Sequence, residues 1–344
     1  GGTHSRLWDT RTRKVLRQFP NQRNFASSFS PDGERLVFGN RRLTFVDAGT
    51  GVEQDRFSAH SRVGLGLALT SDGKTAYSIN TGPIIRKWDV GSTKQTGELT
   101  LPTGSARSVA VSRDGRTVAV AQKDNVHLFD TRTGRAVGEP YRHEQLVSSV
   151  AFSPTRDLLV SRSSDGKAQF WNSQSGALEA TMDLGMSPIH LGYSVFSRDG
   201  RMLALVSPDK STVDIVNAAT RKRVRKIQIH EALVSFFLPT CFLPDNKELA
   251  TLTVSPDPEE ETRVLYHFDL QDLASGVLRQ RLQGAFEYPS AIACPPQGDV
   301  IAVADEAVSP RKHFVRVYST ATGKLLAQFD GHVDRIRQLT FSPD

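Results

Sequence analysis

Short apolar stretches joined by tight turns recur from one end of the chain to the other. The recurring phrase is an apolar stretch, a small residue, often Pro, and then a turn, as in Ser28-Phe29-Ser30-Pro31-Asp32-Gly33. A second apolar stretch follows the turn directly, as in Val118-Ala119-Val120. Asp-Gly and Pro-Asp favour the turns of β-hairpins, where glycine supplies the positive φ that other residues avoid. No helical period competes with this pattern, which therefore predicts an all-β protein.

The hairpin phrase occurs eight times. Its third position falls at residues 30, 70, 112, 153, 197, 243, 294 and 342, at intervals between 40 and 51 residues. A third strand follows each hairpin and ends in an aromatic or β-branched residue, usually before Asp or Asn, as in Trp88-Asp89. A turn such as Thr133-Gly134 then leads to a fourth strand. Four short strands in a repeat of this length are typical of one blade of a β-propeller.

Counting the strands predicts a single β-propeller domain over residues 1–344. The chain begins with a third and fourth strand and ends on a first strand, which gives seven complete antiparallel blades and part-blades at residues 1–20 and 332–344. An open strand edge promotes aggregation, so we expect the two ends to share a split eighth blade and favour eight blades over seven. Because the chain opens on Gly1-Gly2 and stops inside a repeat phrase, we expect it to be part of a longer protein.

The units resemble WD repeats, of the degenerate kind found in bacterial proteins. The most complete unit holds His143, Ser161, Asp165 and Trp171, with Asp165 six residues before Trp171. The resemblance implies that His143, Ser161 or Ser163, Asp165 and Trp171 form a buried hydrogen-bond chain that supports the blade. It also implies a non-enzymatic scaffold for protein–protein interaction.

Composition and charge narrow the class of protein without identifying a partner. The chain is 38% hydrophobic and 23% charged, and its net charge of +6 is small for 344 residues. No apolar run is long enough for a membrane helix and no signal peptide is visible, so we expect no membrane association. Cys241 and Cys294 lie in apolar stretches and are expected to be buried free thiols, as in a reducing compartment. We therefore expect a monomeric, cytoplasmic propeller.

The residues that usually carry chemistry follow the repeat and form no catalytic motif. Four of the nine histidines precede a first strand at corresponding positions, which predicts a packing role for His60, His143, His230 and His332. No two histidines share a short metal-binding spacing, and neither a nucleophile elbow nor a phosphate loop is present. We expect no metal, no cofactor and no enzymatic activity. A propeller can still assemble a site at the mouth of its central channel, so an enzyme or small-ligand binder is the alternative.

The strongest basic cluster is Arg221-Lys222-Arg223 with Arg225-Lys226. It falls on a fourth strand, where Lys and Arg protect a sheet edge from pairing with other chains. Contact with nucleic acid, or with an acidic domain of the same protein, is the alternative interpretation. Aromatic residues do not interleave with the cluster, so stacking on single-stranded nucleic acid is not expected.

Blades six and seven are lengthened at one place. The spacing from the first-strand marker to the third-strand marker is 16 to 19 residues in the first five blades, and 25 and 24 in the last two. The extra residues fall between strands two and three, at 255–263 and 305–313, and smaller extras occur at 182–191 and 229–238. Such connections emerge on one face, here called the top face, and insertions gathered on one face of a repeat array often bind partners.

The top face therefore provides the candidate binding residues for a protein or peptide partner, which could be another domain of the same chain. Two groups of opposite charge are combined there with two histidines expected in loops. The candidates are Asp257, Glu259, Glu260, Glu261, Arg311, Lys312, His190 and His313.

Overall fold

Hydroxyl and carboxylate side chains close the first hairpin of four blades, which explains the recurring phrase there. In the computed structural model, Oγ of Ser112 donates to Oδ1 of Asp114 at 2.6 Å and accepts the N–H of Thr117 at 3.0 Å. Gly115 follows with a φ of 69°, a conformation that glycine adopts without strain. The same contact joins Ser30 to Asp32, Thr70 to Asp72 and Ser197 to Asp199.

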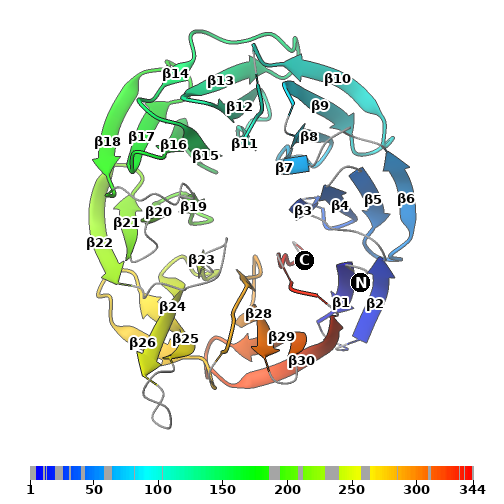
Figure 1. The fold of residues 1–344 in the computed structure, drawn as a ribbon, viewed down its shortest axis with the longest axis vertical. Helices are drawn as coiled ribbons and strands as arrows, with labels where there is room; N and C mark the ends of the chain where they lie inside the picture. The colour runs from blue at the N-terminus through cyan, green and yellow to red at the C-terminus, as the bar shows by residue number, and fades with distance from the viewer. Residues whose placement is uncertain are drawn as a thin grey trace. The chain divides into compact units, whose positions relative to one another are not determined.

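The structure describes residues 5–342, except residues 11, 13, 20–25, 31, 40–42, 58–63, 81, 103, 186–193, 208–211, 229–239, 257–263, 285, 309–310, 333 and 337. Within these residues there is no helix, and so none that could span a membrane. The strands form seven four-stranded antiparallel sheets and one two-stranded sheet. Each four-stranded sheet is one blade, and the all-β chain is a β-propeller, as predicted (Figure 1).

The strands of each blade follow one another in sequence order. Blades 1 to 4 consist of β3 (Ala26–Phe29), β4 (Arg35–Gly39), β5 (Leu43–Asp47), β6 (Glu53–Phe57); β7 (Gly64–Leu69), β8 (Thr75–Asn80), β9 (Ile84–Asp89), β10 (Gln95–Thr100); β11 (Ser108–Val111), β12 (Thr117–Gln122), β13 (Asn125–Asp130), β14 (Tyr141–Arg142); β15 (Val147–Phe152), β16 (Leu158–Ser163), β17 (Lys167–Asn172) and β18 (Leu178–Asp183). Blades 5 to 7 consist of β19 (Ser194–Phe196), β20 (Met202–Val206), β21 (Thr212–Asn217), β22 (Lys222–Gln228); β23 (Thr240–Phe242), β24 (Glu248–Pro256), β25 (Val264–Asp272), β26 (Leu278–Arg281); β27 (Ala291–Ala293), β28 (Val300–Val308), β29 (Arg311–Ser319) and β30 (Leu325–His332).

Successive blades pack face to face through apolar side chains. The chain forms two compact units, one of residues 24–209 and 216–222 and the other of residues 1–23, 210–215 and 223–344. In the first unit, Phe45 of blade 1 and Trp88 of blade 2 share one buried cluster, and the first strands β3, β7, β11 and β15 lie side by side (Figure 1). In the second unit, an apolar cluster joins blades 6 and 7 in the same way.

In blade 7 the added length is built into β28 and β29, which corrects the expectation of a loop there. In blade 6 the strands are also longer, while residues 257–263 of the expected loop lie outside the described residues. β24, β25, β28 and β29 have nine residues each, whereas the second and third strands of the other blades have five or six. The pairing between β28 and β29 runs from Val300 and Ser319 to Val308 and Arg311. The alternation of side chains continues through these segments, so the backbone hydrogen bonds of the hairpins continue as well.

The N-terminal part-blade is a two-stranded sheet of β1 (Ser5–Asp9) and β2 (Lys14–Phe19). The ring of Trp8 lies 4.5 Å from that of Phe329, and Ile336 and Phe341 join the same apolar cluster. The described residues of 334–342 form no strand. The C-terminal segment thus meets β1 through apolar contacts, without the strand expected for a split eighth blade.

Cys241 and Cys294 form a disulfide, so the expectation of two free thiols is wrong. The first strands of blades 6 and 7 lie side by side, which brings the two Cα atoms to 6.2 Å although 53 residues separate them. A separation of about one repeat places the two cysteines at similar positions in neighbouring blades, and this spacing could have predicted the disulfide from the sequence. The argument from free thiols for a reducing compartment no longer holds, and the cytoplasmic location stays a prediction.

Candidate partner-binding site

The two long hairpins of blades 6 and 7 are tied together by the connection between β26 and β27. The N–H of Phe286 donates to the carbonyl oxygen of Tyr266 on β25 at 2.8 Å. Two residues further on, the N–H of Tyr288 donates to Oδ1 of Asp305 on β28 at 2.9 Å. One short segment therefore bonds to both hairpins, and the three pieces form a continuous surface, here called the hairpin face.

A buried charge pair lies beneath the hairpin face. Asp305 is 2% exposed, and Nη1 of Arg316 lies 3.5 Å from its Oδ2. Arg316 stands over the rings of Phe314 and Phe286, at 4.4 and 5.7 Å from their centroids. Burial raises the pKa of Asp305 to about 6, although Arg316 and the N–H of Tyr288 act in the opposite direction. Stacking and ion pairing hold these side chains in fixed positions.

Exposed groups surround this buried pair. Tyr288 is 39% exposed although its backbone is fixed by Asp305. Lys312 is exposed on β29, and Glu306 on β28 is partly exposed. On blade 6, Oγ of Ser255 and Nε2 of His267 are 2.9 Å apart, and burial lowers the pKa of His267. The two hairpins and the segment between them thus carry an exposed aromatic side chain and exposed or partly exposed groups of both charges.

The predicted binding residues reach this region only in part. Asp257, Glu259, Glu260, Glu261 and His190 lie outside the described residues. Arg311 and Lys312 open β29, opposite Val308 and Ala307.

His313 is not a loop residue as expected. It is buried within β29, with Nδ1 3.7 Å from Oε2 of Glu306, and it pairs with His332 of β30. His332 accordingly ends a fourth strand, and does not stand before a first strand.

The predicted hydrogen-bond chain of blade 4 is found in three of its four members. Ser161 Oγ lies 2.6 Å from Nε2 of His143 and accepts the indole N–H of Trp171 at 2.8 Å. Asp165 binds Ser163 and the N–H of Lys167, and has no direct hydrogen bond to His143 in the structure. These side chains are inside the blade, where they support packing and do not form a binding surface.

The basic cluster of blade 5 is largely engaged within the protein. Arg221 forms an ion pair with Glu179, and Nε of Arg223 lies 2.5 Å from Oδ1 of the buried Asp214. Nη2 of Arg225 donates to the carbonyl oxygen of Ala274 at 2.7 Å. These contacts favour the role in protecting a sheet edge over contact with nucleic acid.

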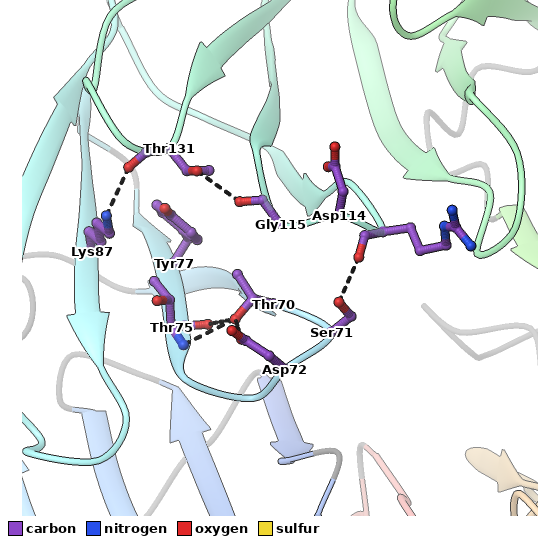
Figure 2. Close-up of a pocket in the computed structure, with 10 residues that line it drawn as sticks. Thr70, Ser71, Asp72, Thr75, Tyr77, Lys87, Asp114, Gly115 and Thr131 are labelled. Carbon is purple, nitrogen blue, oxygen red and sulfur yellow. Dashed lines mark hydrogen bonds between the residues drawn. The ribbon is translucent and has the colours of Figure 1, made fainter.

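A cavity lies between blades 2 and 3. It belongs to the first unit and has a volume of about 230 Å³, with Tyr77 and Lys87 in its lining. Figure 2 shows both side chains beside Thr131 and the turn that holds Thr70 and Asp72. The cavity was not predicted from the sequence, where its signal is a polar residue on each of two strands at positions that are apolar in five other blades.

Three comparisons place the chain among known proteins. The family model "WD domain, G-beta repeat" matches residues 134–172, which include blade 4 up to Trp171. Autophagy-related protein 16 of Arabidopsis thaliana is 30% identical over 36% of this chain and 25% of its own length. Human WD repeat-containing protein 90 is 24% identical over 98% of this chain, which spans about a fifth (20%) of that protein. The crystal structure of the computationally designed Ika8 protein has a TM-score of 0.69 at 16% identity, over 92% of this chain and 90% of that one.

The four-stranded blades define a β-propeller. Its blade 4 has the Trp171–Ser161–His143 contacts and matches the WD-repeat model. The chain is a β-propeller in which residues 134–172 match the WD repeat, and it is similar in sequence to WD-repeat proteins.

Proposed function

We propose that this chain is a non-enzymatic scaffold that binds a protein or peptide through the hairpin face. The observation that supports this most directly is Tyr288, which is 39% exposed on a backbone fixed by Asp305. Tyrosine is enriched at the centres of protein interfaces because it buries a large area at a small cost in side-chain entropy. Similarity to WD-repeat proteins supports a role as a binding scaffold in general.

The charges around Tyr288 suit a partner with charges of both signs. Lys312 is exposed, and Glu306 and Glu287 are partly exposed. In sequence, the acidic run at 257–261 follows β24, and Arg311 begins β29. Charge complementarity of this kind determines specificity and association rate more than affinity.

The alternative of a catalytic or ligand site at the channel mouth required His and carboxylate side chains converging from several blades. Among the residues that the structure describes, no group of three or more His, Cys, Asp or Glu is placed to hold a metal ion. No observation in this part of the chain favours that alternative, and we do not adopt it.

The test is a comparison of surface variants in affinity capture from the source organism, followed by titration of the captured partner. Tyr288→Ala and the pair Arg311→Glu/Lys312→Glu alter the hairpin face. Val277→Ala is the matched control, because Val277 is 62% exposed at the far end of blade 6. We expect Tyr288→Ala to weaken the purified complex by about tenfold or more, and Val277→Ala to leave it unchanged. Equal recovery of every partner by all variants would refute the hairpin face as the binding site.

A further inference from the structure

One cross-strand pair in blade 2 consists of polar residues at a position where five other blades have two buried apolar residues. Tyr77 on β8 lies opposite Lys87 on β9. In five other blades the equivalent pair joins two buried apolar residues, namely Val37 and Phe45, Ala119 and Leu128, Val160 and Phe170, Ala250 and Leu270, and Ala302 and Val317. The blade fold therefore does not require a phenol and an ammonium group at these positions.

The Tyr77 hydroxyl faces the cavity without a partner. The side chain is completely buried, and its Oη has no hydrogen bond in the structure. The Thr131 hydroxyl is close by: it donates to the carbonyl oxygen of Gly115 at 2.8 Å, and its interaction with the phenol lowers the pKa of Tyr77 without offsetting the effect of burial. Burial raises the pKa of Tyr77 to about 12, so the hydroxyl keeps its proton at neutral pH. An unpaired buried donor is unfavourable, and a ligand acceptor would satisfy it.

Lys87 adds positive charge beside this donor. Its Nζ donates to the carbonyl oxygen of Thr131 at 2.8 Å, which uses one of the three ammonium protons. Lys87 and Tyr77 line the same cavity, as Figure 2 shows. A carboxylate between the two groups would accept hydrogen bonds from both, and bonds between charged groups are the strong ones.

Charges of both signs line the mouth of the cavity. Asp72 and Asp114 line it from the turns of blades 2 and 3 together with Arg113, and all three residues are exposed. Hydrogen bonds from the hydroxyls of Thr70 and Ser112 lower the pKa of Asp72 and Asp114 respectively, so both are ionised at neutral pH. Two carboxylates at the mouth would repel a dianion and attract a cationic group.

We propose that this cavity binds a small zwitterion of the amino-acid type, with its carboxylate on Lys87 and Tyr77 and its ammonium group beside Asp72 and Asp114. A volume of about 230 Å³ is that of roughly seven or eight water molecules at about 30 Å³ each, which suits a short amino acid. The site is built from blades 2 and 3 alone, and it is independent of the proposed scaffold function.

The experiment is a titration of the whole chain followed by ¹H–¹⁵N correlation spectra, read at the amides of Thr75, Gly115 and Thr131. The probes are β-alanine, acetate and inorganic phosphate. We expect saturable shifts with β-alanine, binding of acetate at least about tenfold weaker because it lacks the ammonium group, and the weakest binding with phosphate. Tighter binding of phosphate than of β-alanine would overturn the ligand class, and the absence of saturable shifts with β-alanine would overturn the site.

Two variants test the residues. Lys87→Leu introduces the residue type that blade 3 carries at Leu128, and we expect it to fold with an equal or higher melting temperature and to bind β-alanine at least about tenfold more weakly. Tyr77→Phe removes one hydroxyl and should weaken binding about three- to tenfold. Lys94→Leu is the matched control on an exposed residue of the same blade, and it should bind as the parent chain does. Unchanged binding by a folded Lys87→Leu chain would refute the assignment.

Discussion

Nε2 of His143 lies 2.6 Å from Oγ of Ser161, and both residues are buried. The indole N–H of Trp171 can only donate, so Ser161 Oγ accepts from it and has its own proton left for His143. We assign that proton to a hydrogen bond with an unprotonated Nε2, so that the neutral imidazole carries its own proton on Nδ1. Burial lowers the pKa of His143 to about 4, which agrees with a neutral ring.

This arrangement predicts a loss of stability in mild acid. The unfolded imidazole titrates near 6.5 and the folded one near 4, so the unfolded state binds the proton first as the pH falls. Between pH 6.5 and 4 the contribution of His143 to the free energy of unfolding should fall by up to about 3 kcal/mol. Urea denaturation of the parent chain and of His143→Gln at several pH values measures this. The difference in unfolding free energy should shrink toward pH 4, and a constant difference would contradict the neutral ring.

Asp305 should show the opposite pH dependence. Burial raises its pKa to about 6, above the unfolded value of about 3.9, so its contribution is present at low pH and is lost as the pH rises through 6. Asp305→Asn keeps an acceptor for the N–H of Tyr288 and removes the titration. Relative to the parent chain, we expect Asp305→Asn to gain roughly 2 kcal/mol between pH 4 and pH 7. A relative loss over that range would show that the Arg316 ion pair dominates over burial.

Reduction of the Cys241–Cys294 disulfide should destabilise blades 6 and 7. The bond closes a loop of 53 residues in sequence, and chain-entropy arguments give a cost of about 4 kcal/mol when a loop of that size is opened. Thermal unfolding with and without dithiothreitol measures the effect, and alkylation followed by mass spectrometry counts the thiols. Two thiols reactive without reductant in the unfolded chain would show that the bond is absent.

The sequence predicts the blades well because their signals are local. Turn chemistry such as Ser112-Arg113-Asp114-Gly115 and the alternation of apolar residues are both read within a few positions. The disulfide and the polar cavity depend instead on which residues face each other across strands. Tyr77 and Lys87 are ten residues apart and become a pair only once the register of β8 and β9 is known. The hairpin face was located by spacing, but strand extension and the burial of His313 depend on pairing that spacing does not report.

Comparing alanine variants of two glycines in blade 7 distinguishes the effect of backbone conformation from the effect of close packing. Gly298 and Gly323 have φ values of 93° and 67°, so alanine at either position is strained by about 1 kcal/mol. A Cβ at residue 298 would meet nothing within 4 Å, whereas a Cβ at residue 323 would overlap the carbonyl oxygen of Arg281 and the side chain of Gln280. The Arg281 oxygen belongs to the backbone of β26 and cannot move aside as the end of a side chain can. Gly323→Ala should therefore cost a further 1–3 kcal/mol or so beyond Gly298→Ala, measured by urea denaturation of both variants. Equal losses in the two variants would show that blades 6 and 7 do not approach each other at this turn.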